Sequence, residues 1–313
     1  MLALLFPGQG SQRVGMGRDV CRVSPAAREV FESADAALGM SLSRLCFEGP
    51  EAELLATEVQ QPALLATSVA LLRALEERAG PLAPGYVAGH SLGEYTALVA
   101  SGSLALDDAL RLVRARGAFM QEAVPAGRGA MAAILGASRE VVETCCARAR
   151  EETGELVEPA NYNAPEQTVI SGTALAVRAA CAVAREAGAR RAMPLPVSAP
   201  FHCALMAPAA DKLAPELSRI RFADPAAPVV ANVTAEPNAS GAEVADLLRR
   251  QVTEPVRFTE QVRRLRALGV TRILEVGPGK VLSALVARIE PALLRANLGA
   301  ADELRAAAAF VAA

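Results

Sequence analysis

The chain has 313 residues, 52% of them hydrophobic, and a formal net charge of −2 at pH 7. This length is enough for one large domain or two smaller ones. The nearly balanced charge gives no indication of a nucleic-acid partner, and no apolar run is long enough to cross a membrane. Two histidines and six scattered cysteines, with no Cys-x-x-Cys pair, predict no metal site and indicate a cytoplasmic protein without disulfides.

The first part of the chain alternates short apolar segments with long helical patterns. The apolar residues 2–6 and 85–88 predict buried strands, the first of them in place of a secretion signal. Apolar residues at three- and four-residue spacing predict helices over 26–38, 63–78, 92–100 and 106–122, with Pro62 in the first turn of the second. Strands that alternate with helices indicate a parallel α/β sheet.

The pattern changes after a linker at 125–129. Strands are expected at 130–135, 156–161, 167–171 and 190–197, with helices at 139–150 and 174–187. This β-α-β-β-α-β order predicts a small ferredoxin-like domain at 127–197, inserted into a large domain of residues 1–126 and 198–313. Further core strands of the large domain are expected at 228–232 and 272–276, and the alanine-rich C-terminus predicts a last helix.

The pentapeptide Gly89-His90-Ser91-Leu92-Gly93 has the Gly-x-Ser-x-Gly pattern of a nucleophile elbow. A predicted strand precedes it and a predicted helix follows it, which is the context that this motif requires. Serine needs a base to take its proton, and His90 lies within the turn itself. The only other histidine is His202, so His202 is the predicted base. His202 follows directly after the inserted domain, so we expect Ser91 and His202 at the mouth of a cleft between the two domains.

Five motifs, taken together, resemble a known family. They are FPGQGSQ at 6–12, GHSLGE at 89–94, RG at 116–117 with FMQ at 119–121, PFH at 200–202 and EVGPG at 275–279. This set, in this order, is similar to the malonyl-CoA:acyl-carrier-protein transacylases and the acyltransferase domains of polyketide synthases, and it spans residues 1 to about 300. The resemblance implies an α/β-hydrolase-like core with a ferredoxin-like insert, in agreement with the predicted domains.

The resemblance also implies a mechanism and its residues. Ser91 would attack the thioester of malonyl-CoA, and His202, oriented by a backbone carbonyl that matches Gln251, would take its proton. The resulting acyl-serine ester would pass to the phosphopantetheine thiol of a holo-acyl carrier protein, with no bound cofactor. The oxyanion donors would be the backbone N–H groups of Gln9 and Leu92, and elbow geometry independently predicts Leu92.

The predicted substrate class depends chiefly on Arg116. A guanidinium binds a carboxylate through two parallel hydrogen bonds, so an arginine in the family's RG motif implies a malonyl group or a branched relative. Phe201 beside the base favours malonyl, since a smaller residue there accompanies methylmalonyl in the polyketide enzymes. Met120, His90 and Asn161 are implied to line the substrate site, and Asn163 resembles a second asparagine that faces the cleft.

Two other functions use the same sequence features. A hydrolase that edits acyl carrier proteins or cleaves acyl-CoA would need the same Ser91 and His202, but would not need Arg116. A silent scaffold subunit would need none of the three. We therefore predict a transacylase that acts as a monomer, serving either fatty-acid or polyketide synthesis.

Overall fold

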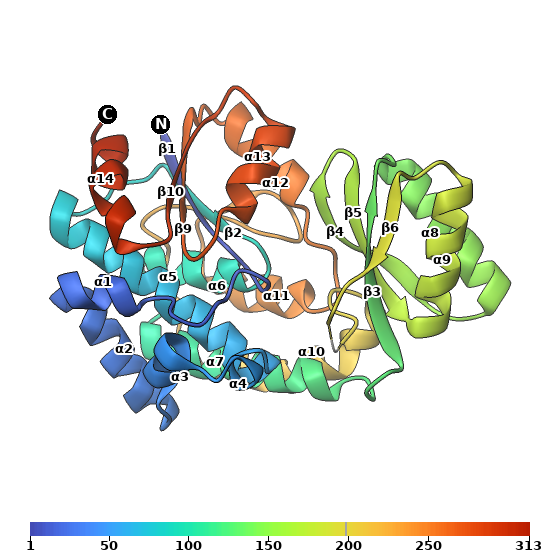
Figure 1. Ribbon diagram of the computed structural model, residues 1–313, viewed down its shortest axis with the longest axis horizontal. Coiled ribbons are helices and arrows are strands. Elements are labelled where there is room, and N and C mark those ends of the chain that lie inside the picture. The colour runs from blue at the N-terminus through green and yellow to red at the C-terminus, as the bar shows by residue number, and fades with distance from the viewer. Residues whose placement is uncertain (198) are drawn as a thin grey trace.

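The computed structural model describes residues 1–197 and 199–313, which form two separate β-sheets (Figure 1). The larger sheet has six strands in the order β10-β9-β1-β2-β7-β8. All neighbouring strands run parallel except β7 and β8, which are antiparallel. The strands are β1 (Leu2–Phe6), β2 (Tyr86–Gly89), β7 (Val229–Val230), β8 (Pro237–Asn238), β9 (Arg272–Val276) and β10 (Leu294–Leu298).

Helices connect these strands and cover both faces of the larger sheet. Those before the second sheet are α1 (Arg18–Val23), α2 (Pro25–Leu38), α3 (Leu42–Glu48), α4 (Glu51–Leu54), α5 (Thr57–Ala79), α6 (Leu92–Ala100) and α7 (Leu106–Glu122). Those after it are α10 (Ala207–Ser218), α11 (Gly241–Gln251), α12 (Phe258–Ala267), α13 (Val281–Ile289) and α14 (Leu304–Ala312), with short 3-10 turns at Ala204–Met206 and Ala301–Glu303.

Strand β1 shows why helices lie on both faces. Successive side chains of a strand point to opposite faces of its sheet. Leu2, Leu4 and Phe6 join the apolar cluster that contains residues of α2, α5, α6 and α7. Ala3 and Leu5 join a second cluster with residues of α12 and α13. Because both faces are covered, every residue of β1 is buried, and the strand is a continuous apolar run. The prediction of a parallel α/β core is confirmed.

The second sheet is antiparallel, with the strand order β4-β5-β3-β6, and lies at the right of Figure 1. Its strands are β3 (Gly129–Leu135), β4 (Val157–Ala164), β5 (Gln167–Thr173) and β6 (Arg191–Pro194), and its helices are α8 (Arg139–Thr153) and α9 (Ala174–Glu186). The β-α-β-β-α-β sequence and this strand order are those of the predicted ferredoxin-like fold. The boundaries 1–126, 127–197 and 198–313 stay predictions, and residue 198 lies outside the described residues.

Some predicted elements have other bounds in the structure. Helix α5 begins at Thr57 instead of residue 63, so the placement of Pro62 in a first turn is wrong, and Pro62 lies inside the helix. The early turns of α5 carry Gln60 and Gln61, which are buried without being apolar, and hydrophobic periodicity therefore does not detect them. Strand β7 covers two residues of the predicted 228–232, and β6 is shorter than the predicted 190–197.

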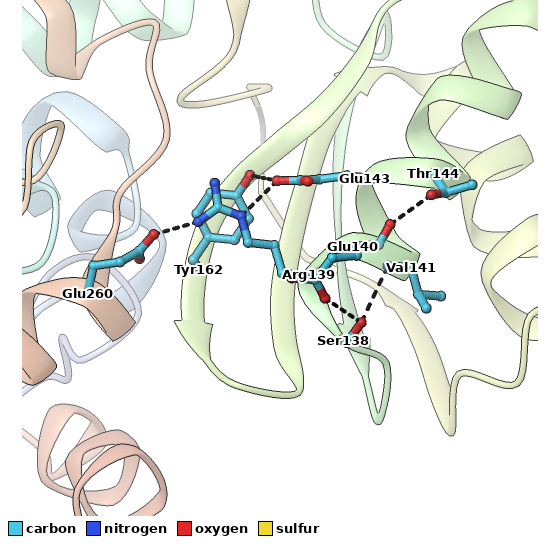
Figure 2. Close-up of polar contacts among 8 residues, drawn as sticks. All are labelled: Ser138, Arg139, Glu140, Val141, Glu143, Thr144, Tyr162 and Glu260. Atoms are coloured by element: carbon cyan, nitrogen blue, oxygen red, sulfur yellow. Dashed lines mark hydrogen bonds and ion pairs between the residues drawn. The ribbon is translucent and has the colours of Figure 1, made fainter.

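The two parts of the molecule contact each other along β4. Asn161 forms an isolated parallel bridge with Val256, and the backbone N–H of Tyr162 donates to the Val256 carbonyl at 2.9 Å. Figure 2 shows the neighbouring side chains, where Arg139 of α8 reaches Glu260 of α12 at 2.5 Å and lies over the Tyr162 ring at 3.8 Å. Backbone and side-chain contacts thus hold the small sheet and α8 against residues 256–260, at the start of α12.

Candidate active site

Ser91 lies in a tight turn between the carboxyl end of β2 and the first residue of α6. Its φ of 51° is in the left-handed region, which a residue with a side chain rarely adopts. A Cβ on Gly93 would lie 2.0 Å from the Phe6 carbonyl oxygen, and a Cβ on Gly89 would lie 2.0 Å from the Gly93 carbonyl carbon. Only glycine fits at either position, so the sequence pattern is explained by the close approach of α6 to β1 and β2.

His202 contacts the serine directly. The distance from Ser91 Oγ to His202 Nε2 is 2.7 Å, and His202 Nδ1 lies 2.8 Å from the backbone oxygen of Gln251. A carbonyl oxygen only accepts, so Nδ1 carries the proton and Nε2 is free to accept the serine proton. Gln251 is the last residue of α11, where backbone carbonyls have no partner within the helix, and this one is used by His202.

The imidazole is buried and neutral. His202 is 4% exposed, and burial, together with the positive charge of Arg116, lowers its pKa to about 3. The Gln251 carbonyl opposes this shift. A base must be unprotonated to act, so His202 is in the required state at neutral pH. Its own φ of 60° is also in the left-handed region, which makes both members of the pair conformationally strained.

Arg116 of α7 is the third member of the cluster, and only 1% of it is exposed. Its Nη2 donates to Ser91 Oγ at 3.0 Å and to Gln251 Oε1 at 3.0 Å, while Nη1 donates to Gln61 Oε1 at 2.7 Å. Gly117 allows this placement, because a Cβ there would lie 2.6 Å from the Thr57 carbonyl oxygen of α5. The structure thus places a buried cation, surrounded by neutral acceptors, beside the serine.

Two further polar residues, Asn232 and Glu94, stabilise the elbow through hydrogen bonds. Asn232, two residues after the end of β7, accepts from the Ser91 backbone N–H at 2.7 Å and donates to the Gly89 carbonyl at 2.7 Å. Glu94, in the first turn of α6, accepts through Oε2 from Gln251 Nε2 at 2.7 Å and from the Asn232 N–H at 3.1 Å. Gln251 Nε2 also donates to the Ser91 carbonyl at 3.0 Å. These side chains join the turn, the base and Arg116 into one buried network.

Sequence reasoning gave no role to Asn232, Glu94 or Gln61. Asn232 ends a predicted core strand, and polar residues at the carboxyl ends of parallel strands mark sites, so this signal was available. Glu94 stands in the elbow motif but was assigned no function. Hydrophobic periodicity predicts that α5 begins at residue 63, after Gln61, whereas the helix begins at Thr57. Nothing in the sequence therefore indicates the contact of Gln61 with Arg116.

The predicted oxyanion donors belong to two segments that meet at the elbow. Leu92 is the first residue of α6, and Gln9 follows the end of β1. The Gln9 loop approaches the elbow closely, since a Cβ on Gly8 would lie 2.5 Å from the His90 carbonyl oxygen. The Gln9 side chain is held by Gln60 and Gln61 of α5. Among the described residues, neither the Gln9 nor the Leu92 backbone N–H has a hydrogen-bond acceptor.

The remaining predicted residues lie around this cluster. Phe201 and Met120 are buried in the apolar cluster of the large sheet. His90 Nε2 lies 2.7 Å from Asn163 Oδ1 of β4, and its ring lies 5.7 Å from that of Phe258. Asn161 is buried where β4 meets Val256. His90 and Asn163 therefore join the elbow to the small sheet.

The described residues contain no candidate metal site. Within 1–197 and 199–313, no group of three or more His, Cys, Asp and Glu side chains is placed to hold a metal ion. The six cysteines are free and buried. In the same part of the chain, no helix has both the length and the apolar character needed to cross a membrane.

Comparison with known proteins identifies close relatives. The model of the acyl transferase domain family matches residues 3–294. The malonyl CoA-acyl carrier protein transacylase of Escherichia coli K12 is 50% identical over 305 residues, which cover 97% of this chain and 98% of that one. The corresponding enzyme of Coxiella burnetii has a solved structure with a TM-score of 0.96 and 40% identity, covering 99% of this chain and 97% of that one.

A third relative was solved together with a partner. It is a malonyl-transacylase in complex with its type II PKS acyl-carrier protein, with a TM-score of 0.95 and 45% identity, covering 98% of this chain and 99% of that one. All three matches extend over nearly the whole length of both chains, so the similarity includes both sheets.

Proposed function

Because the chain belongs to the malonyl CoA-acyl carrier protein transacylase family, we propose that it transfers a malonyl group from malonyl-CoA to an acyl carrier protein through an ester on Ser91. The acceptor is the phosphopantetheine thiol of the holo-carrier protein, and no bound cofactor takes part. The two half-reactions follow a ping-pong order, in which CoA leaves before the carrier protein reacts.

In the first half-reaction, Ser91 Oγ attacks the thioester carbonyl carbon and its proton passes to His202 Nε2, 2.7 Å away. The carbonyl oxygen becomes an oxyanion and accepts from the Gln9 and Leu92 N–H groups. Leu92 also places it at the N-terminus of α6, where the helix dipole favours negative charge. When the carbon–sulfur bond breaks, the CoA sulfur takes the proton from His202.

The second half-reaction reverses these steps with another thiol. The phosphopantetheine thiol gives its proton to His202 Nε2 and its sulfur attacks the ester carbonyl. The bond to Ser91 Oγ then breaks, and Oγ recovers the proton from His202. Reactant and product are both thioesters, so the enzyme's task is to exclude water from the ester. The low exposure of Ser91, 8%, and of His202, 4%, supports such exclusion.

The observation that carries the proposal is the contact between Arg116 Nη2 and Ser91 Oγ at 3.0 Å. In a malonyl ester the carboxylate carbon is three bonds from Oγ, so its oxygens reach the same guanidinium. A buried guanidinium without an acidic hydrogen-bond partner is complementary to a carboxylate that arrives with the substrate. Phe201 and Met120 are proposed to form apolar walls of the acyl site, and His90 and Asn161 to line the side toward the small sheet.

A hydrolase would use the same pair of residues but has no use for Arg116. The carrier protein as acceptor is supported by the relative solved with a type II PKS acyl-carrier protein. We propose that the enzyme acts as a monomer in the cytoplasm, in fatty-acid or trans-acting polyketide synthesis. The genes beside its own distinguish these two pathways.

The test is a transfer assay with malonyl-CoA and a holo-acyl carrier protein, followed by mass spectrometry of the carrier protein and measurement of free malonate. The proposal predicts malonyl-carrier protein in amounts equal to the CoA released, and none with Ser91→Ala. Release of CoA with equal free malonate, and no malonylated carrier protein, would show a hydrolase instead.

A further inference from the structure

Glu94 is a buried acidic side chain in the network around Ser91, and the proposed mechanism does not use it. It is 3% exposed and lies three residues after the nucleophile, on the first turn of α6. Both of its hydrogen bonds go to residues of the site, since Oε2 accepts from Gln251 Nε2 at 2.7 Å and from the Asn232 N–H at 3.1 Å. Its contacts therefore lead to the cluster rather than to a helix terminus or to solvent.

The bond to Gln251 fixes the orientation of an amide group. Glu94 Oε2 is an acceptor, because the Asn232 backbone N–H donates to it, so the NH₂ end of the Gln251 amide faces it. The oxygen end must then point the other way, and Gln251 Oε1 indeed accepts from Arg116 Nη2 at 3.0 Å. With the amide reversed, the NH₂ group would face the guanidinium, and two donors would oppose each other.

We propose that Glu94 is a positioning residue for malonyl selectivity, which acts by fixing the Gln251 amide so that its oxygen holds Arg116 beside Ser91. This inference rests on the proposed function. Glu94 does not touch His202 or Ser91 Oγ. Its effect passes through Gln251 to the cation that binds the malonyl carboxylate.

The burial of Glu94 is consistent with this role. Burial raises the pKa of its carboxyl group to about 7, while the bonds from Gln251 and Asn232 and the charge of Arg116 lower it. Burying a carboxyl group is unfavourable unless it is hydrogen-bonded, and here the two hydrogen-bond donors belong to residues that themselves contact Ser91.

The test compares kcat/KM for malonyl-CoA with kcat/KM for acetyl-CoA in Glu94→Leu, Glu94→Gln and the parent protein. Leucine accepts no hydrogen bond, so the Gln251 NH₂ group loses its 2.7 Å acceptor and the amide is held less firmly, chiefly by the Ser91 carbonyl and Arg116. We expect the malonyl-to-acetyl ratio to fall by about tenfold or more in Glu94→Leu, mainly through the KM for malonyl-CoA, because a hydrogen bond to a charged group is worth roughly that factor. Glutamine still offers one oxygen to both donors, so Glu94→Gln should retain the ratio within about threefold.

Glu275→Gln is the matched control, because Glu275 is also a buried carboxylate but caps α13, away from Arg116. It should leave the ratio unchanged. An equal fall of kcat/KM for malonyl-CoA and acetyl-CoA in Glu94→Leu would overturn the inference, because the malonyl-to-acetyl ratio would then be unchanged. If Glu94→Leu does not fold, Gln251→Leu removes the donor of the Gln251–Glu94 hydrogen bond. An unchanged malonyl-to-acetyl ratio in Gln251→Leu would then overturn the inference. A parent protein without malonyl preference would overturn the proposed function as well.

Discussion

Arg116 Nη2 donates a hydrogen bond to Ser91 Oγ at 3.0 Å, so the cation contacts the proposed nucleophile directly. The serine hydroxyl accepts from Arg116 while it donates to His202 Nε2. In the proposed reaction, a malonyl ester on Ser91 would bring its own carboxylate to this cation, whereas an acetyl ester would leave the buried charge without an anion. The same contact therefore links the reactive atom to the choice of acyl group.

Replacing Arg116 by lysine should reduce malonyl selectivity while keeping a positive charge. Lysine cannot form the two parallel hydrogen bonds of a guanidinium with a carboxylate. We expect kcat/KM for malonyl-CoA to fall by about 10- to 100-fold, in line with roughly 1.5–3 kcal/mol for hydrogen bonds to a charged group, and kcat/KM for acetyl-CoA to fall less.

Arg114→Lys is the control for this variant. Arg114 lies on the same helix and donates to the Leu38 carbonyl at 2.9 Å, away from Ser91. Steady-state kinetics with both CoA esters should show the parent ratio in Arg114→Lys. A parent ratio in Arg116→Lys as well would argue against recognition of the malonyl carboxylate at Arg116.

Both histidines should titrate at a lower pH in the folded protein than in the unfolded chain. Burial lowers the pKa of His90, and burial and Arg116 lower that of His202 to about 3. Nuclear magnetic resonance of the labelled rings should show His202 neutral down to about pH 5 and His90 titrating at a lower pH than in urea, where both rings should titrate at about 6.5. His90→Gln assigns the remaining signal to His202. A His202 midpoint above pH 6 in the folded protein would contradict the buried neutral base.

The same shift predicts how stability depends on pH. Between about pH 3 and 6.5 the unfolded chain binds a proton at His202 that the folded protein does not. The contribution of His202 to the free energy of unfolding should therefore decrease as the pH falls through this window. Comparison with His202→Gln by urea denaturation isolates it, since the variant should lack the part of the pH dependence that comes from His202 and keep the parts that come from His90 and Glu94.

Gly93→Ala should disrupt the elbow. The added Cβ would lie 2.0 Å from the Phe6 carbonyl oxygen, and backbone cannot move aside as a flexible side chain can. We expect a loss of about 3 kcal/mol or more in the free energy of unfolding, at the upper end of overpacking effects. Gly102→Ala, with a φ of 74° and no atom within 4 Å of its added Cβ, should lose only about 1–2 kcal/mol. Similar losses in the two variants, measured by urea denaturation, would argue against this steric explanation.

Glu275→Gln should weaken the start of α13. The Glu275 carboxylate accepts from the Leu282 N–H at 3.0 Å and from the Ser283 N–H at 2.7 Å. An amide offers only one acceptor oxygen, so its NH₂ group would face one of these two backbone N–H groups, and two donors would oppose each other. We expect the free energy of unfolding to fall by about 1–2 kcal/mol. An unchanged melting temperature would show that these bonds do not stabilise the helix.

Much of this structure follows from local sequence patterns. Helix α7 covers the predicted residues 106–122, α6 begins at Leu92 as the elbow requires, and the β-α-β-β-α-β pattern gives the second sheet. These elements are set by residues close together in the chain. The contact of His202 with the Gln251 carbonyl was expected from family resemblance, and the structure brings these groups together.

The polar network could not be predicted in the same way. Gln61 of α5, Glu94 of α6 and Asn232 of the turn after β7 meet at the cluster, and their hydrogen bonds join residues far apart in the chain. The burial of Gln61 and Glu94 depends on these partners, so no local pattern marks them, whereas Asn232 is marked only by its place at the end of a predicted strand. The start of α5 was misplaced for the same reason, because its buried glutamines are held by side-chain contacts rather than by an apolar face.

The most direct test is intact-protein mass spectrometry after brief mixing with malonyl-CoA or acetyl-CoA, on the parent protein, Ser91→Ala and Arg116→Ala. The account predicts a malonyl adduct on the parent protein, none on Ser91→Ala, and loss of the preference for malonyl over acetyl in Arg116→Ala. A malonyl adduct that persists in Ser91→Ala, or no adduct on a parent protein that releases CoA, would contradict transfer through an ester on Ser91.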